Sequence, residues 1–295
     1  MWIKKFNKLK VIIKIEVMKI LKFFIALLGL SSGVYAQNNT YTVTGTRFLL
    51  PLFENFNAEL SNEGFSKIFE ATARNPNADI IATATPNELP AVKDGFSQYA
   101  IAKIFYLPVV NKSHPDIQQL LQEGIRISDL KNIFFKKEDV NQFNPSKSFN
   151  VLTRNACAAV SFSNFLKEDI KHIVNDYHKI ENDSLLIDLV SKDILGITFL
   201  DPSNIYDSKT GEIKSGFAIL PIDLNNNGKI DEDENFYTNR DTLIKKLSNS
   251  SIDLPSGLLA VTVANQEKEV FVKYVNWIKE KGKHIIENFG FLTLN

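Results

Sequence analysis

Hydrophobic and polar positions along the chain repeat one plan, and that plan predicts strands that alternate with helices. Residues 41–44 alternate as a strand does, Gly45 interrupts them, and the stretch from Pro51 has apolar residues at helical spacing. Residues 149–153 form a second strand-like run, followed by a turn and a helical pattern over residues 158–166. Two such units predict an α/β protein of two lobes, with a cleft where strand ends meet helix starts and ligands bind.

The rest of the chain carries further buried runs and amphipathic segments without a strict repeat. We expect two mixed sheets flanked by helices, the architecture of a two-lobed binding protein. The predicted strands are residues 78–86, 100–110, 195–200, 216–222 and 257–264, and the predicted helices are residues 127–137, 185–190, 240–250 and 268–291.

The first 36 residues have the pattern of an export signal. Basic residues after Met18 precede an apolar run at residues 23–30, and Val34-Tyr35-Ala36 fits a signal-peptidase site before Gln37. We therefore predict a cleaved signal peptide, with translation from Met18 as one option and an uncleaved membrane anchor as the alternative. Cys157 is the single cysteine, so no intrachain disulfide can form, and we expect a periplasmic location.

Removal of that segment changes the charge balance of the protein. The whole chain has 34 basic and 34 acidic residues. The segment holds seven lysines and one glutamate, so the remainder has 27 basic and 33 acidic residues and a net charge of −6. An acidic surface of this kind does not favour nucleic acid as a partner.

The segment DLNNNGKIDEDE at residues 223–234 has suitable residue types at every ligand position of a calcium-binding loop. Such loops supply oxygens from positions 1, 3, 5, 7, 9 and 12 and need a glycine at position 6, where Gly228 stands. We predict a structural Ca²⁺ here, and a solvated turn is the alternative because Asn-Gly and Asp clusters are common in turns. The predicted ligands are Asp223, Asn225, Asn227, the carbonyl of Lys229, Asp231 and Glu234.

Six segments, in this order, resemble the PstS-like family, the periplasmic substrate-binding proteins of phosphate ABC transporters. They are GTRFLLPL (45–52), ADIIATATP (78–86), YAIAKIFYLPVVNKSHP (99–115), ISDLKNIFF (127–135), TRNACAAVSF (153–162) and FVKYVNWIKEKGKHIIENFGFLTL (271–294). The resemblance covers nearly all of residues 41–295 and implies a type II periplasmic-binding-protein fold. It implies a first lobe of residues 37–108 and 219–295, including the calcium-type loop, and a second lobe of residues 109–218.

The resemblance also implies an anion site in the cleft, held by helix amides, hydroxyls and an arginine. Two departures weaken it for phosphate: the family's Ser-Gly-Thr turn falls on Ala158, Ala159 and Val160, and its aspartate falls on Ala84. Another oxyanion or a carboxylated molecule therefore remains an alternative ligand. The implied anion-binding residues are Thr46, Arg47, Phe48, Thr83, Thr85, Arg154, Ala158 and Ala159.

The chain lacks the common catalytic motifs. The four histidines are not spaced as zinc ligands, and no nucleotide-binding or nucleophile-elbow pattern occurs. We therefore predict a non-enzymatic, monomeric periplasmic protein that binds phosphate or another small oxyanion and delivers it to an ABC permease. The alternative is a calcium-stabilised interaction module on a degenerate binding-protein scaffold.

Overall fold

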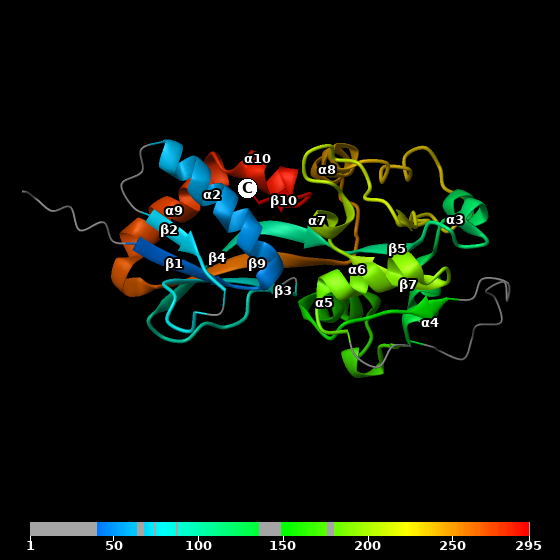
Figure 1. Ribbon diagram of the computed structural model, residues 1–295, viewed down its shortest axis with the longest axis horizontal. Helices are drawn as coiled ribbons and strands as arrows, with labels where there is room; N and C mark the ends of the chain where they lie inside the picture. Colours follow the sequence, from blue (N-terminus) through cyan, green and yellow to red (C-terminus); the bar gives the residue numbers. More distant parts are fainter. Residues whose placement is uncertain are drawn as a thin grey trace, which may run out of the picture. The chain divides into compact units, whose positions relative to one another are not determined.

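Figure 1 shows the computed structural model, which describes residues 40–63, 68–73, 75–86, 88–135, 149–175 and 180–294. The predicted signal peptide, residues 1–36, lies outside these ranges. Within them, no helix is both long and apolar enough to cross a membrane.

Six strands form the first sheet, in the order β10-β4-β9-β3-β1-β2. β1 and β3 run parallel, whereas β9 is antiparallel to both of its neighbours, β3 and β4. This sheet is therefore mixed, as the sequence predicted. Its strands are β1 (Thr40–Gly45), β2 (Ile68–Ala71), β3 (Ile80–Thr85), β4 (Phe96–Phe105), β9 (Ser256–Ala264) and β10 (Leu292–Thr293).

Four strands form the second sheet, in the order β6-β7-β5-β8. β6 and β7 are parallel, and β5 is antiparallel to β7 and β8. Both sheets belong to one compact unit that begins at Tyr41. The strands are β5 (Leu107–Asn111), β6 (Asn150–Val151), β7 (Gly196–Leu200) and β8 (Phe217–Ile219).

Helices cover the sheets through their apolar faces. In α2 (Leu50–Asn62), a proline in the first turn pre-forms the helix start, and Leu52, Phe53, Phe56 and Leu60 are buried. The other α-helices are α3 (Ile117–Glu123), α4 (Ile127–Phe135), α5 (Cys157–Leu166), α6 (Asp183–Lys192), α7 (Pro202–Ile205), α8 (Arg240–Ser248), α9 (Lys268–Glu280) and α10 (Lys283–Asn288). Three short 3₁₀ turns are η1 (Arg47–Leu49), η3 (Ile170–His172) and η4 (Asn265–Glu267).

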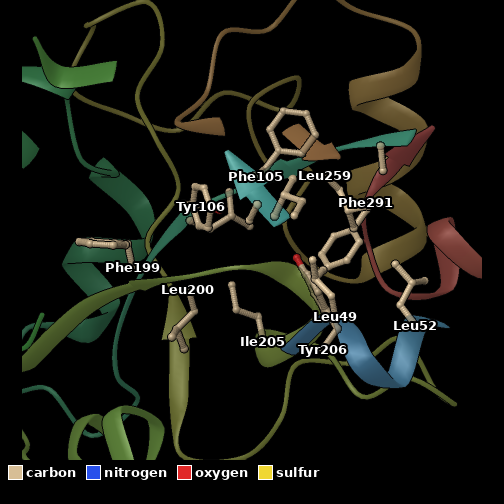
Figure 2. Packing of buried hydrophobic residues seen from close by; sticks show 14 of the residues in the cluster. Leu49, Leu52, Phe105, Tyr106, Phe199, Leu200, Ile205, Tyr206, Leu259 and Phe291 are labelled. Carbon is tan, nitrogen blue, oxygen red and sulfur yellow. The ribbon is translucent and has the colours of Figure 1, made fainter. Parts of the chain in front are cut away.

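The chain passes from the first sheet to the second at Tyr106. The sequence predicted one strand over residues 100–110, but β4 ends at Phe105 and β5 begins at Leu107. The Tyr106 amide donates to the carbonyl of Pro255 (2.8 Å), so this crossing is tied to the segment that returns to the first sheet. Figure 2 shows Tyr106 between Phe105 of the first sheet and Phe199 of the second. The buried cluster therefore runs without a break through the crossing.

Three other differences from the expected elements have local causes. The single helix predicted over residues 268–291 is two helices, because Gly282 starts α10 after a turn. The predicted strand 149–153 shortens to β6, since the chain leaves the sheet toward α5. Four short elements, β2, β10, α3 and α7, were not predicted, because runs of two to seven residues carry little periodic signal.

Candidate functional site

A cleft of about 1080 Å³ lies where the first and second sheets present their turns to each other. One wall is the turn after β1, residues 45–48, and Tyr106 of the crossing also lines it. The opposite wall consists of residues 154–158 before and at the start of α5, residues 181–184 at the start of α6, and two residues after β7, Asp201 and Asn204.

Gly45 forms the first wall. Its φ of +142° is one that side chains rarely adopt, and a Cβ atom there would lie 1.8 Å from the carbonyl oxygen of Ala82 on β3. The next residue, Thr46, donates its amide to that same oxygen (2.9 Å). Glycine is therefore required for β1 to approach β3 this closely, and the approach fixes where Thr46 and Arg47 enter the cleft.

The start of α5 forms the centre of the opposite wall. Ala156 stands at the N-cap in extended conformation (φ −151°, ψ 176°), and no side chain caps the helix. The first amides of a helix have no acceptor within the helix, and the helix dipole makes this end positive. This helix start borders the cleft, because Ala156, Cys157 and Ala158 all line it.

Arg154 lies beside that helix start and is held by an ion pair. Its Nε and Nη2 atoms donate to Oδ1 of Asp183 at 2.9 and 2.6 Å. The two side chains are 25% and 30% exposed, so both still face the cleft. A guanidinium has five N–H donors, so the pair fixes Arg154 in place and leaves other donors for a ligand.

Asp201 is the most deeply buried acid of the cleft. Its carboxylate accepts hydrogen bonds from the Ser203 amide (3.1 Å) and from Nδ2 of Asn204 (2.7 Å), as well as from the Ser203 hydroxyl. Burial raises the pKa of the Asp201 carboxyl, and the nearby Asp183 raises it further. The hydrogen bonds only partly offset the cost of burying this charge.

Tyr106 presents a buried hydroxyl in the same region. The residue is 1% exposed, and burial raises the pKa of its phenol well above the usual range. Neither this hydroxyl nor the neighbouring one of Ser161 makes a hydrogen bond of normal geometry within the described part of the chain. Buried hydroxyls in native proteins nearly always have a partner, and Tyr106 and Ser161 interact with each other.

The structure brings most of the predicted anion-binding residues to one place. Thr46, Arg47, Phe48, Arg154 and Ala158 line the cleft itself.

An adjoining hollow of about 810 Å³ contains Thr83 and Thr85 and shares Thr46 and Cys157 with the cleft. The Thr85 hydroxyl donates to the carbonyl of Pro86 (3.0 Å), so its proton is already used. The side chain of Ala159 is fully buried, which leaves only its backbone amide for a ligand.

Sequence reasoning missed the acidic side of the cleft, which contains Glu181, Asp183 and Asp201. A local signal was present, because Asn182 caps α6 by accepting from the Leu185 amide, and Asp201 caps α7 before a proline. Cap residues mark helix starts in a sequence. They do not show that two helix starts distant along the chain meet in one cleft.

The acidic loop folds around two buried carboxylates, Asp223 and Glu234, which are 1% and 2% exposed. The carboxylate of Asp223 accepts from the amides of Asn227 (3.1 Å) and Gly228 (2.9 Å). Gly228 has the positive φ (+82°) that the sharp turn of a calcium loop needs. No group of three or more His, Cys, Asp or Glu side chains among the described residues is arranged to hold a metal ion. Calcium binding therefore stays a prediction.

The same loop packs on the second-sheet half of the protein. The Ile230 amide donates to the carbonyl of Gln122 in α3 (2.8 Å), and the Asp223 amide donates to the carbonyl of Ile125 just after α3 (3.1 Å). The resemblance implied that residues 219–295, including this loop, belong to the first lobe, whereas these contacts join the loop to α3. Later in the same stretch, α8 packs on β10 of the first sheet.

Solved structures with a similar fold include transporter binding proteins. A putative phosphate ABC transporter substrate-binding protein with bound phosphate, from Clostridium perfringens, has a TM-score of 0.63 at 12% identity, over 87% of this chain and all of that one. An ABC-type phosphate transport receptor from Vibrio cholerae has a TM-score of 0.55 at 13% identity, over 86% of this chain and all of that one. The chain shares their fold.

The same fold also occurs in proteins of a different description. An OxyR variant from Corynebacterium glutamicum has a TM-score of 0.54 at 12% identity, over 94% of this chain and 78% of that one. No protein-family model and no curated protein matches this sequence. At these identities the likeness establishes the fold alone, a two-lobed α/β architecture.

Proposed function

We propose that this chain is a periplasmic solute-binding protein that binds phosphate or a related oxyanion in its cleft and delivers it to an ABC permease. Two structural neighbours, described as a phosphate-bound substrate-binding protein and a phosphate transport receptor, support the phosphate part of this proposal. Proteins of this architecture close their two lobes around the ligand, so groups from both walls meet it. The proposal assigns no catalytic step to the chain.

The observation that carries this proposal is the uncapped start of α5 beside Arg154. Backbone N–H groups at a helix start, together with the dipole, form a ready anion site, and an arginine adds charged donors. The start of α6, on the same wall, is already occupied by its own Asn182 side chain. An oxyanion from solution can therefore complete α5 in a way that it cannot complete α6.

The proposed site should hold phosphate less firmly than one with hydroxyl donors. Ala158, Ala159 and Val160 offer only backbone amides in the first turn of α5. Each missing hydrogen bond to a charged ligand removes about 1.5–3 kcal/mol of binding free energy. We expect dissociation constants in the micromolar to millimolar range, so a test should use millimolar ligand.

Thermal unfolding of the purified protein tests the proposal. A ligand that binds only the folded state stabilises it, by about 2.7 kcal/mol at a concentration 100 times its dissociation constant. We expect millimolar phosphate or sulfate to raise the melting temperature, and chloride at equal ionic strength not to raise it. The proposal is wrong if no oxyanion among phosphate, sulfate and arsenate shifts the transition.

We further propose that Ca²⁺ binds the loop at residues 223–234, through the six ligands predicted above, and stabilises the fold. The buried Asp223 and Glu234 carboxylates support this, since both are held by loop amides in the positions of a calcium loop's first and last ligands. Titration with Ca²⁺ should raise the melting temperature of the wild type but not of Glu234→Gln. An equal response of both proteins contradicts the proposal.

The second candidate function is a calcium-stabilised interaction module on the same scaffold. It is favoured by the loss of hydroxyls at the start of α5 and by the pairing of Arg154 with Asp183. One measurement distinguishes the two candidates. The melting temperature of such a module depends on calcium, and no anion changes it.

A further inference from the structure

The cleft contains more acidic than basic side chains, which is unexpected for a site that takes a bare anion. Its lining includes the carboxyl groups of Glu181, Asp183 and Asp201, against the guanidinium groups of Arg47 and Arg154. An anion brought near these carboxylates is repelled, most strongly near the buried Asp201, where water is excluded. A ligand that carries its own positive group would offset this repulsion.

A small hollow beside the cleft has the size and lining for such a group. It measures about 20 Å³ and is bounded by Arg154, Asp183 and Asp201, with apolar walls from Leu186 and Phe199. A volume slightly above 10–15 Å³ on this measure holds one water-sized group. A primary ammonium group is of that size and has three donors for the surrounding oxygens.

Asp183 has an acceptor available for that ammonium group. Both donors of Arg154 bind Oδ1 of Asp183, and the structure gives Oδ2 no hydrogen bond among the described residues. Asp201 uses its oxygens for Ser203 and Asn204, and burial raises the pKa of its carboxyl although Lys214 lies nearby. A cation between the two carboxylates would favour the ionised form of both.

The Tyr106 hydroxyl gives a second, independent sign of an occupant. It is buried and lines the cleft, and although the Ser161 hydroxyl lies beside it, it makes no hydrogen bond of normal geometry within the described residues. Its electrostatic neighbours include Asp201 and Asp183. A phenol beside two carboxylates is well placed to accept a hydrogen bond from an ammonium group that they bind.

The site also has room for a carbon skeleton between the two charged groups. The cleft of about 1080 Å³ is as large as sites for drug-sized ligands. The adjoining hollow of about 810 Å³ shares Thr46 and Cys157 with it and is lined by Pro86, Leu89 and Val92. An inorganic anion would leave these surfaces without a contact.

We propose that the physiological ligand is a zwitterion in which an oxyanion and a primary amine are joined by a short carbon chain. The oxyanion binds the start of α5 and Arg154, and the amine enters the hollow between Asp183 and Asp201, near Tyr106. This inference rests on the proposed function, because it uses the same anion-binding site and adds a cation-binding site, the hollow between Asp183 and Asp201.

Calorimetry with matched ligands tests the proposed cation-binding site. Inorganic phosphate, ethyl phosphate and O-phosphoethanolamine share the phosphoryl group, and the last two differ chiefly by the amine. Propionate and β-alanine form the corresponding carboxylate pair. We expect the amine-bearing member of at least one pair to bind at least tenfold more tightly than its partner.

Variants show whether Asp183 binds the amine of the ligand or only positions Arg154. Asp183→Asn should weaken the amine-bearing ligand at least tenfold and leave the amine-free one unchanged or tighter, because a negative charge is removed. Tyr106→Phe should lower affinity for the amine-bearing ligand several-fold without lowering the melting temperature, since its hydroxyl makes no hydrogen bond of normal geometry with the described residues. Asp188→Asn, on the exposed face of the same helix and paired with Lys192, is the control and should change neither.

The outcomes distinguish this inference from the proposed function. If amine-free anions bind and the amine adds nothing, the zwitterion is wrong and the proposed function stands. The same conclusion follows if Asp183→Asn weakens both members of a pair equally, because Asp183 then acts only by positioning Arg154. If none of the five ligands binds at millimolar concentration, the zwitterion proposal is wrong, and the proposed function fails with it only if sulfate and arsenate also do not bind.

Discussion

The starts of α5 and α6 have nearly the same backbone conformation, but only α6 has a side chain that caps it. Both helices are ten residues long and both begin on the same wall of the cleft. Ala156 before α5 has φ −151° and ψ 176°, and Asn182 before α6 has φ −153° and ψ 169°. Asn182 caps its helix through the Leu185 amide (2.9 Å), whereas Ala156 has no side-chain atom that could do so.

This difference shows which helix start lacks a hydrogen-bond acceptor from the protein's own N-cap side chain. An N-cap side chain contributes about 0.5–2 kcal/mol to stability, so a helix that lacks one gives up that contribution. At α6 the protein supplies the acceptor itself. At α5 the backbone is set for a cap that the sequence does not provide, and the neighbouring Arg154 adds positive charge. A bound oxyanion would supply the missing acceptor.

A ligand at the start of α5 also needs the opposite wall of the cleft, residues 45–48. Of the four variants, Gly45→Ala should have the largest effect, because it disturbs that wall. The new Cβ would overlap the Ala82 carbonyl oxygen, and the φ of +142° is strained for alanine. We expect a loss of on the order of 3 kcal/mol or more in unfolding free energy, measured by urea denaturation. Gly95→Ala is the control, because Gly95 also has positive φ (+89°) but nothing lies within 4 Å of its built Cβ. Equal losses in both variants would contradict the close approach of β1 to β3.

Arg154→Met should have the next largest effect, on anion binding. It removes charged donors beside the start of α5, and hydrogen bonds to charged groups contribute about 1.5–3 kcal/mol each, so affinity should fall about tenfold to a hundredfold. Calorimetry with inorganic phosphate measures this. Arg126→Met, which breaks the Arg126–Asp129 pair before and within α4, is the matched control and should bind as the wild type does. Unchanged phosphate binding by Arg154→Met would remove Arg154 from the site.

The sequence predicted those parts of the site that a local pattern determines. The elements around Gly45 and Arg154 were predicted because strand, turn and helix lie within a few residues of each other. The split of residues 100–110 at Tyr106 was not predicted, because a continuous apolar run does not show where a chain changes sheets. The carboxylates of Asp183 and Asp201 were missed because only tertiary packing brings them to the same cleft.

Ala156→Asn converts α5 into a copy of α6 and should change stability and binding in opposite directions. The backbone already has cap geometry, so the new side chain should stabilise the fold by about 1 kcal/mol. The same side chain would occupy the amides that we assign to the oxyanion, so phosphate affinity should fall. Thermal unfolding and calorimetry on one preparation measure both. A gain in stability with unchanged phosphate affinity would place the anion elsewhere.

Asn182→Ala makes the reverse change and should have the smallest effect of the four. Loss of the cap removes the bond to the Leu185 amide and should cost about 1 kcal/mol of stability. Phosphate affinity should remain within about twofold of the wild type, because Asp183 still holds Arg154 and the start of α5 is untouched. If phosphate instead stabilises Asn182→Ala more than it stabilises the wild type, the anion can complete either helix start. The two starts would then differ only in which of them carries its own cap.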